Sequence, residues 1–262
     1  MTFRQAGFAS LILPCIGLSL GLIAPDARGD EGLVDRAVVV PKRVARLTLG
    51  PSLSIYNDDV ETTTATHAGL AFDYGWFERL QIGAYANAEL TGARNFGNRS
   101  LGLLVPNIII APMREFGFRL DLGAGLRREG ANETGPSLFA GIGIPTSITL
   151  CSWLAVDVGR PYAATPEYDL LAVDLGSSGY PVARIPLGVM VSPTSFSAIV
   201  LRGSFRNELA PFLVKHRYTT FGADGLLQLG HSNALVLSAR FDGEVKRPVS
   251  RFDTEILWQV FL

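Results

Sequence analysis

The last twelve residues of the chain, Arg251 to Leu262, read RFDTEILWQVFL and alternate between apolar and charged or polar side chains. One parity contains Phe252, Thr254, Ile256, Trp258, Val260 and Leu262, and Thr254 is its single polar member. The other parity contains Arg251, Asp253, Glu255 and Gln259. Successive side chains of a strand point to opposite faces. The segment is therefore predicted to be a β-strand with one apolar and one charged face.

The same alternation recurs upstream, in segments of about ten residues. Clear examples are Arg79 to Leu90, Phe116 to Arg127 and Ala234 to Glu244. The full pattern predicts twelve strands, at residues 45–56, 64–74, 79–91, 100–111, 116–127, 135–149, 152–160, 180–191, 196–206, 217–229, 233–244 and 251–262. The connections between them alternate between short turns and longer, more polar loops. The longest loop spans Arg160 to Gly179.

Composition separates this chain from ordinary soluble domains. Of its 262 residues 48% are hydrophobic and 18% are charged, 28 are glycine, and the mean hydropathy is +0.26. After the N-terminus, no apolar run reaches the length of about 18 residues that a membrane-spanning helix needs. A chain this apolar must spread its hydrophobic residues over many short segments, as a membrane barrel does when alternate residues face lipid.

These patterns predict an all-β protein, a transmembrane antiparallel up-and-down β-barrel of about 12 strands. Counts of ten or fourteen strands remain open. The fourth strand, LGLLVPNIII, alternates poorly, and residues Tyr168 to Leu175 could form a strand inside the longest loop. An even strand count returns both ends of the chain to the same side of the membrane, the side with the short turns.

The final strand resembles the C-terminal signal of bacterial outer-membrane proteins, in which alternating hydrophobic residues lead to a terminal aromatic. Here Leu262 takes the place of that aromatic, and Phe261 is out of phase. Residues 72–83 are similar to the periplasmic hairpins of small channel-like outer-membrane proteins. The resemblance implies location in the bacterial outer membrane, with its lipid and lipopolysaccharide as surroundings. It also implies recognition of Phe252, Ile256, Trp258, Val260 and Leu262 by the outer-membrane assembly machinery.

The N-terminus has the features of a secretory signal. Arg4 precedes the apolar stretch Gly7 to Ala24, and small residues follow at Ala27-Arg28-Gly29. We expect residues 1–29 to be a signal peptide, with cleavage after Ala24 or Ala27 as alternatives and an uncleaved anchor helix as another. Residues 30–44 would then form a periplasmic lead and residues 45–262 the barrel. Cys15 follows Leu13-Pro14, which is a poor match to a lipoprotein signal.

The net charge and the cysteine content limit which partners and which disulfides we expect. Removal of residues 1–29 takes two of the 23 basic and one of the 24 acidic residues, which leaves a net charge of about −2 and no electrostatic preference for nucleic acid. Cys151 would be the one remaining cysteine, so an internal disulfide cannot form. No cofactor or metal is expected, and an amphiphilic or small polar solute is the expected ligand.

The polar parity predicts a charged lumen. It places arginines 46, 79, 119, 127, 184, 202, 206 and 240 opposite carboxylates 73, 89, 121, 157, 224, 242, 253 and 255. Equal numbers of the two signs favour either a narrow polar pore or a lumen closed by ion pairs. The candidates for lining a constriction are Arg119, Asp121, Arg127, Arg202, Arg206, Asp224, Arg240, Asp242, Asp253 and Glu255.

The sequence supports an enzymatic function less well than a channel or a structural role. His231-Ser232-Asn233 is faintly similar to the His and Ser of outer-membrane phospholipases, but adjacent residues face opposite ways and the trio falls in a turn. Tyr56 to Asp59 with His67 could bind calcium as in lipid A deacylases, although a solvated loop explains these residues better. His216 lies in a loop and has no evident companion. We therefore expect no catalytic residues.

Three functions remain in order of preference. The first is a passive channel, and the second is a non-conducting structural or adhesin barrel acting through its outer loops. The third is a lipid-modifying hydrolase. Trp76, Phe77, Trp153 and Trp258 fall at predicted periplasmic strand ends, where an aromatic girdle is expected.

Overall fold

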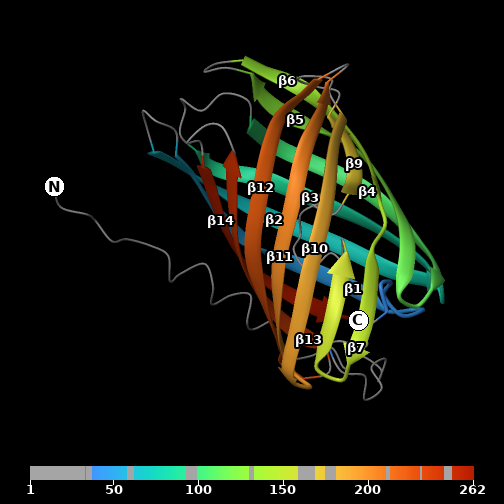
Figure 1. Ribbon diagram of the computed structural model, residues 1–262. Helices are drawn as coiled ribbons and strands as arrows, with labels where there is room; N and C mark the ends of the chain where they lie inside the picture. Colours follow the sequence, from blue (N-terminus) through green and yellow to red (C-terminus); the bar gives the residue numbers. More distant parts are fainter. Residues whose placement is uncertain are drawn as a thin grey trace.

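The computed structural model describes residues 33, 37–57, 62–92, 99–129, 133–158, 169–174, 181–210, 213–230, 232–244 and 250–262. These residues build one antiparallel barrel (Figure 1). Among them, no helix is long and apolar enough to cross a membrane. The strands are β1 (Ala45–Asn57), β2 (Thr62–Phe77), β3 (Leu80–Gly92), β4 (Arg99–Met113), β5 (Phe116–Glu129), β6 (Glu133–Gly143), β7 (Thr146–Cys151), β8 (Leu154–Val158), β9 (Asp169–Asp174), β10 (Pro181–Thr194), β11 (Ser197–Ala210), β12 (Leu213–Gln228), β13 (Asn233–Glu244) and β14 (Ser250–Phe261).

The fourteen elements make a wall of twelve strands, which confirms the predicted fold. β6 and β7 follow one another along a single wall position, because both pair with β5. β8 and β9 share the next position, since both pair with β10. The predicted sixth strand is divided at Ile144-Pro145, where proline has no N–H to donate to the ladder. β9 is the extra strand that the sequence allowed inside the longest loop.

The barrel closes between the first and the last strand. β1 pairs antiparallel with β14, from Arg46 opposite Phe261 to Asn57 opposite Ser250. At its lower end, Ala45 N–H donates to the Leu262 carbonyl at 2.9 Å, and Leu262 N–H donates to the Ala45 carbonyl at 2.8 Å. Both ends of the barrel wall therefore lie at the same rim. We call this rim the short-turn end, because four two-residue turns lie there, at residues 78–79, 114–115, 152–153 and 195–196.

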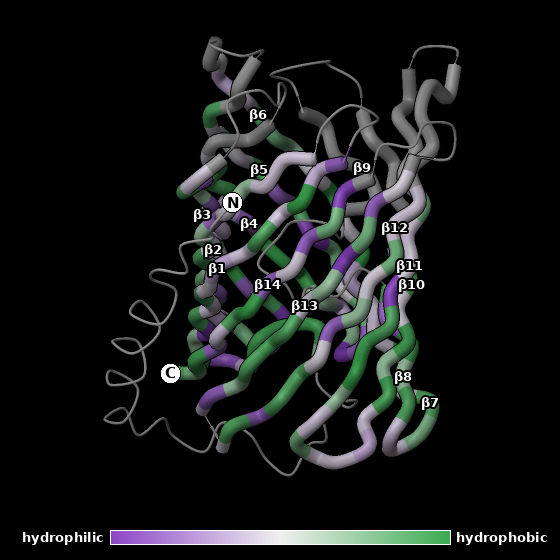
Figure 2. The backbone as a smooth tube through the Cα atoms, turned by 90° about the vertical axis from the view of Figure 1, so that its left-hand side faces the viewer, coloured by the Kyte–Doolittle hydropathy of each residue, from purple (hydrophilic) through white to green (hydrophobic). Residues whose placement is uncertain are grey.

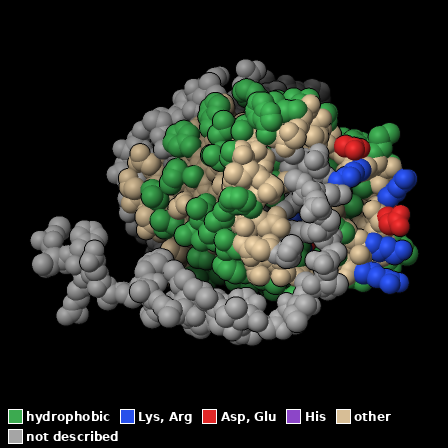
Figure 3. Space-filling view, turned by 90° about the horizontal axis from the view of Figure 1, so that it is seen from below, with side chains coloured by type: hydrophobic (Ala, Val, Ile, Leu, Met, Phe, Trp, Pro, Cys, Tyr) green, Lys and Arg blue, Asp and Glu red, His purple; other side chains and the backbone are tan. Residues whose placement is uncertain are grey.

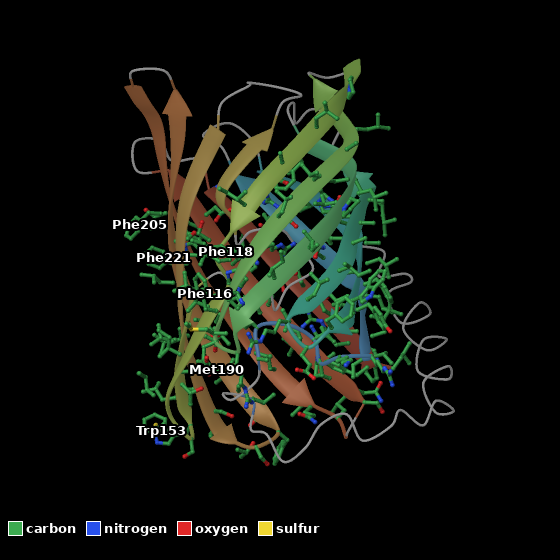
Figure 4. All side chains as sticks on the ribbon, turned by 90° about the vertical axis from the view of Figure 1, so that its right-hand side faces the viewer. Phe116, Phe118, Trp153, Met190, Phe205 and Phe221 are labelled. Carbon is green, nitrogen blue, oxygen red and sulfur yellow. The ribbon has the colours of Figure 1, made fainter. Side chains whose placement is uncertain are left out.

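The apolar parity of the strands faces outward. Phe118, Leu122 and Leu126 on β5 are 53%, 55% and 58% exposed, whereas Arg119 and Asp121 between them are buried. In Figure 4, Phe205, Phe221 and Trp153 point away from the wall. Figure 2 shows hydrophobic and hydrophilic residues alternating along the tube. The strand parity read from the sequence is confirmed, and the outer surface is an apolar belt suited to lipid.

Aromatic residues lie on the outside near the short-turn end. Trp76, Phe77, Trp153 and Phe196 are each more than half exposed. Trp76 and Phe77 lie with their ring centroids 6.3 Å apart. Tryptophan and other aromatic rings favour the boundary between lipid and headgroups. Their position marks where one face of the bilayer meets the barrel.

Candidate functional site

The interior of the barrel carries most of the charged residues that the sequence assigned to the lumen. The described candidates that are buried are Arg119, Asp121, Asp224, Arg240, Asp253 and Glu255. Arg202 and Asp242 are half-buried. Arg127 and Arg206 belong to β5 and β11, but their side chains lie outside the described residues. The candidate residues that the structure describes therefore lie on the inner face of the barrel wall.

One lumen ion pair is fully enclosed. Arg119 and Asp121 lie two residues apart on β5 and so project from the same face of the strand. Arg119 Nε and Nη2 both donate to Asp121 Oδ1, at 2.8 and 2.7 Å. The two side chains are only 5% and 0% exposed. This bidentate contact compensates both charges in a place where water does not reach them.

Other lumen pairs leave part of the arginine side chain exposed. Arg202 Nε lies 2.6 Å from Asp224 Oδ2, and the Ser238 hydroxyl donates to Asp224 Oδ1 at 2.7 Å. Arg251 Nε lies 2.8 Å from Asp253 Oδ1. In both pairs the carboxylate is buried at the wall, while Arg202 and Arg251 remain 22% and 40% exposed. These arginines extend from the wall into the lumen.

A third network joins the lumen to the chain before β1. Arg46 binds Asp73 Oδ2 at 2.7 Å, and Gln81 Nε2 donates to Asp73 Oδ1 at 2.8 Å. Gln81 Oε1 in turn accepts the N–H of Val40 at 2.9 Å. Gln81 is 1% exposed. The sequence did not identify Gln81, because its role depends on a neighbour 41 residues away that does not belong to a strand.

Part of the lumen is apolar, which strand parity alone did not predict. Six side chains form what we call the apolar lumen site: Tyr85, Val105, Met190, Val200, Val236 and Leu257. They come from β3, β4, β10, β11, β13 and β14, and each is at most 5% exposed. Leu33, which precedes the barrel in the chain, packs into the same cluster and is 2% exposed. The lumen is thus crossed by an apolar layer.

The described residues between Leu33 and β1 line the inside of the short-turn end. Val38 and Val39 pack against Ile109 and Ala111 of β4. Val38 N–H donates to the Arg114 carbonyl at 3.1 Å, and Arg43 N–H donates to the Gly75 carbonyl at 2.7 Å. Residues 37–44, which we call the docking segment, belong to the stretch 30–44 that the sequence assigns to a periplasmic lead. In the structure they are bound to the barrel.

Gly75 allows the docking segment to pass close to β2. A Cβ at this position would lie 2.6 Å from the Val40 carbonyl oxygen and would overlap the Pro41 carbonyl oxygen. Both are backbone atoms, so a side-chain rotation cannot relieve the overlap. Glycine is therefore required for this contact.

We expect Gly75→Ala to loosen the docking segment while the wall stays paired. Hydrogen exchange at the Val38 and Val40 amides should accelerate about tenfold or more, because their hydrogen bonds would open more often. The matched control is Gly225→Ala, where the nearest atom to an added Cβ is 4.0 Å away. Mass spectrometry of the peptide covering residues 37–44 measures the effect. Unchanged exchange in Gly75→Ala would contradict this account of the contact.

All eight carboxylates that the sequence assigned to the lumen, and four of the eight assigned arginines, lie on the lumen face of the described residues. Arg79 was expected inside, but it is exposed in the turn between β2 and β3, because that turn is where the strand ends. The side chains of Arg127, Arg184 and Arg206 lie outside the described residues. Of the described lumen-facing side chains, five are arginines (46, 119, 202, 240, 251) and eight are carboxylates (73, 89, 121, 157, 224, 242, 253, 255).

The charged groups at the short-turn rim are separate from the lumen. Figure 3 shows them gathered on one side of this end, while the other coloured atoms of this face belong to hydrophobic and other uncharged side chains or to the backbone. The exposed members are Lys42, Arg43, Glu78, Arg79, Arg114 and Glu115. They adjoin the docking segment and the first two short turns.

Several of the weaker catalytic candidates lie outside the described residues. His67 lies on the lumen side of β2 and is half-buried, whereas Asp58, Asp59, His231 and the side chain of His216 lie outside the described residues. Within the described part of the chain, no group of three His, Cys, Asp or Glu side chains could hold a metal ion. Of the terminal strand, Phe252, Ile256 and Leu262 are exposed on the outer face, and Trp258 Nε1 lies 3.3 Å from Asn233 Oδ1.

Comparison with known proteins identifies the fold. No family model matches the sequence, and no curated protein matches it. The structure is similar to the translocator domain of the autotransporter NalP from Neisseria meningitidis, with a TM-score of 0.50 and 11% identity over 82% of this chain and 88% of that one. The fold is that of an outer-membrane β-barrel. The CymD monoaromatic hydrocarbon channel is similar too, with a TM-score of 0.50 and 9% identity over 84% of this chain and 88% of that one.

An outer-membrane barrel has a defined orientation. Short turns and both termini of such barrels lie in the periplasm, and long loops lie outside the cell. The short-turn end is therefore the periplasmic end. It follows that the docking segment lies at the periplasmic end of the lumen, where Val40 contacts the Arg46–Asp73–Gln81 network.

Proposed function

We propose that this protein is a narrow passive channel for small polar or amphiphilic solutes. The observation that supports it is the exposure of the lumen ion pairs. Arg46, Arg202 and Arg251 are 20%, 22% and 40% exposed, although the carboxylates they bind are 11%, 3% and 6% exposed. A lumen closed by ion pairs would bury both partners, as happens at Arg119 and Asp121. Partly exposed arginine side chains on the lumen face instead suit a water-filled path.

The constriction of this channel is proposed to lie among β11 to β14. Arg240 faces Asp253 across the β13–β14 ladder, and Ser238 faces Glu255 one lumen position lower. The other members are Arg202 on β11, Asp224 on β12 and Asp242 on β13. Opposed charges on facing side chains create a transverse field rather than a ring of one sign, so weak ion selectivity is expected.

Planar-bilayer recordings test the channel. The refolded protein should show heat-modifiable mobility and single-channel conductance. A variant without residues 30–40 should conduct at least as well, because the docking segment would no longer narrow the periplasmic end. If both proteins fold and neither conducts, the channel proposal fails and a structural or adhesin barrel takes its place.

Replacement of Arg202 by glutamine is expected to make the channel more selective for cations. The change removes the positive charge of the partly exposed Arg202 beside the buried Asp224. A unit charge about 4 Å from an ion in water is worth about 1 kcal/mol, which corresponds to about a fivefold change in partition. Reversal potentials in a KCl gradient should shift toward the potassium potential accordingly. Arg114→Gln at the rim serves as the control and should move the reversal potential far less.

The outer surface and terminal strand suggest the surroundings of this channel. We propose that outer-membrane lipid and lipopolysaccharide contact the apolar belt, and that the assembly machinery recognises Phe252, Ile256, Trp258, Val260 and Leu262. Both proposals are supported by the exposure, on one face of the last strand, of Phe252, Ile256 and Leu262. No catalytic role is proposed.

A further inference from the structure

The side chains of the apolar lumen site are too well buried to line a water-filled path. Val105, Met190, Val200 and Val236 are each 0% exposed, and Leu257 is 1% exposed. The arginines of three lumen ion pairs, on the same inner face of the wall, remain 20%, 22% and 40% exposed. Water beside the apolar lumen site would leave its side chains partly exposed in the same way. The barrel is therefore dry at this site.

Leu33 is the described member of this cluster that does not belong to the wall. A barrel of about eight strands is just narrow enough for its own side chains to fill it, and a larger barrel such as this one has a wider interior. A group from outside the wall is therefore needed to cover the inward-facing apolar side chains. Leu33 is such a group, since its side chain is 2% exposed and packs among them.

Leu33 and the docking segment are held by separate contacts. Leu33 packs in the cluster of the apolar lumen site, whereas Val38 and Val39 pack in a second cluster with Ile109 and Ala111. The docking segment is also fixed by its own backbone hydrogen bonds to the wall. Leu33 can therefore leave its place while the docking segment stays bound.

We propose that Leu33 is the gate of this channel. With Leu33 in place, the apolar lumen site is dry and closed to ions, because a hydrophobic constriction excludes the water that an ion needs around it. When Leu33 leaves, water enters between the wall side chains and the path opens. The proposal rests on the proposed channel function, because it describes how that channel is regulated.

The strength of this gate follows from the size of the buried side chain. Full burial of a leucine side chain favours the buried state by about ten- to a hundredfold. The gate is then closed most of the time and opens spontaneously for about 1–10% of the time. We therefore expect the channel to conduct in brief openings.

Thiol modification of the folded barrel in detergent micelles tests whether Leu33 keeps the site dry. Cys15 and Cys151 are first replaced by serine, and Val236→Cys then supplies a single thiol in the apolar lumen site. The probe is trimethylammonioethyl methanethiosulfonate, which is permanently charged and reacts only where water reaches the thiol. Adding Leu33→Ser should accelerate the reaction about tenfold or more, because the buried apolar group is lost. Equal rates with Leu33 and with Leu33→Ser would overturn the gate.

Two controls accompany this measurement. Leu33→Ile keeps an apolar side chain of the same volume and should leave the rate at position 236 within about twofold of the rate with Leu33. Ser52→Cys places the thiol at a half-buried position on the lumen face of β1, away from the apolar cluster. Its reaction should be insensitive to the residue at position 33. Equal acceleration at both positions by Leu33→Ser would show a general loosening of the barrel and would also overturn the gate.

Planar-bilayer recordings test the gate without any change in the wall. Leu33→Ser should raise the open probability about tenfold and leave the single-channel current unchanged, because only the preference for the closed state is lost. Leu33→Ile should keep the open probability of the wild type. An open probability that Leu33→Ser does not change would overturn the proposal, even if Val236→Cys failed to fold.

The outcomes separate the gate from the channel itself. Thiol modification in micelles does not depend on conduction, so protection by Leu33 without conductance in any variant would refute the channel and retain the closure of the lumen by Leu33. Conductance that does not depend on the residue at position 33 would refute the gate alone.

Discussion

Gly50→Ala is expected to prevent closure of the barrel. A Cβ at Gly50 would overlap the carbonyl oxygen of Ile256 and lie 2.9 Å from its carbonyl carbon. Both atoms belong to the backbone of β14, which must pair with β1 to complete the wall. Pro51 follows and has no N–H to donate, so this point of the seam has few hydrogen bonds with which to compensate. The strands would have to separate.

The measurement is the heat-modifiable band of the refolded protein on a gel run without boiling. Gly50→Ala should lose most or all of this band, since an open sheet exposes unpaired backbone groups to lipid. Gly203→Ala is the control, because there the nearest atom to an added Cβ is 3.9 Å away. Normal folding of Gly50→Ala would show that the seam between β1 and β14 is wider than described.

Strand parity was readable from sequence because a barrel wall imposes a strict period of two. Alternation in Phe116 to Arg127 placed Leu122 outside and Asp121 inside, and both positions are confirmed. The break at Ile144-Pro145 was not foreseen, because the apolar run continues through it. The signal was nevertheless present in Pro145, which cannot donate to a ladder.

The apolar contents of the lumen were missed, although the sequence carried a sign of them. The fourth predicted strand alternates poorly because Val105, Ile109 and Ala111 face inward. Val105 meets the cluster around Leu33, while Ile109 and Ala111 meet Val38 and Val39. An apolar residue on a lumen face therefore indicates that another part of the chain covers it. Which part covers it depends on tertiary packing that periodicity does not encode.

Charge pairing was predictable only where it is local. Arg119 with Asp121 and Arg251 with Asp253 are two residues apart on one strand, so their contact follows from parity. Arg46 with Asp73 requires the register of β1 against β2, and the Arg202–Asp224 contact requires that of β11 against β12. Strand parity therefore identified the described candidates that face the lumen, but not their partners on neighbouring strands.

Replacement of Asp121 by leucine is expected to destabilise the barrel strongly. Arg119 is 5% exposed and would keep its charge without its bidentate partner. Breaking a buried ion pair from one side typically costs about 3–5 kcal/mol.

The double variant Arg119→Met/Asp121→Leu removes both charges and should recover stability to within about 1 kcal/mol of the wild type, since a buried pair often contributes little relative to apolar residues of similar volume. Urea unfolding in lipid vesicles, followed by tryptophan fluorescence, measures both. Glu115→Gln in the exposed turn before β5 should show no measurable shift. A double variant as unstable as Asp121→Leu alone would mean that the pair is needed for packing rather than for mutual compensation of charge.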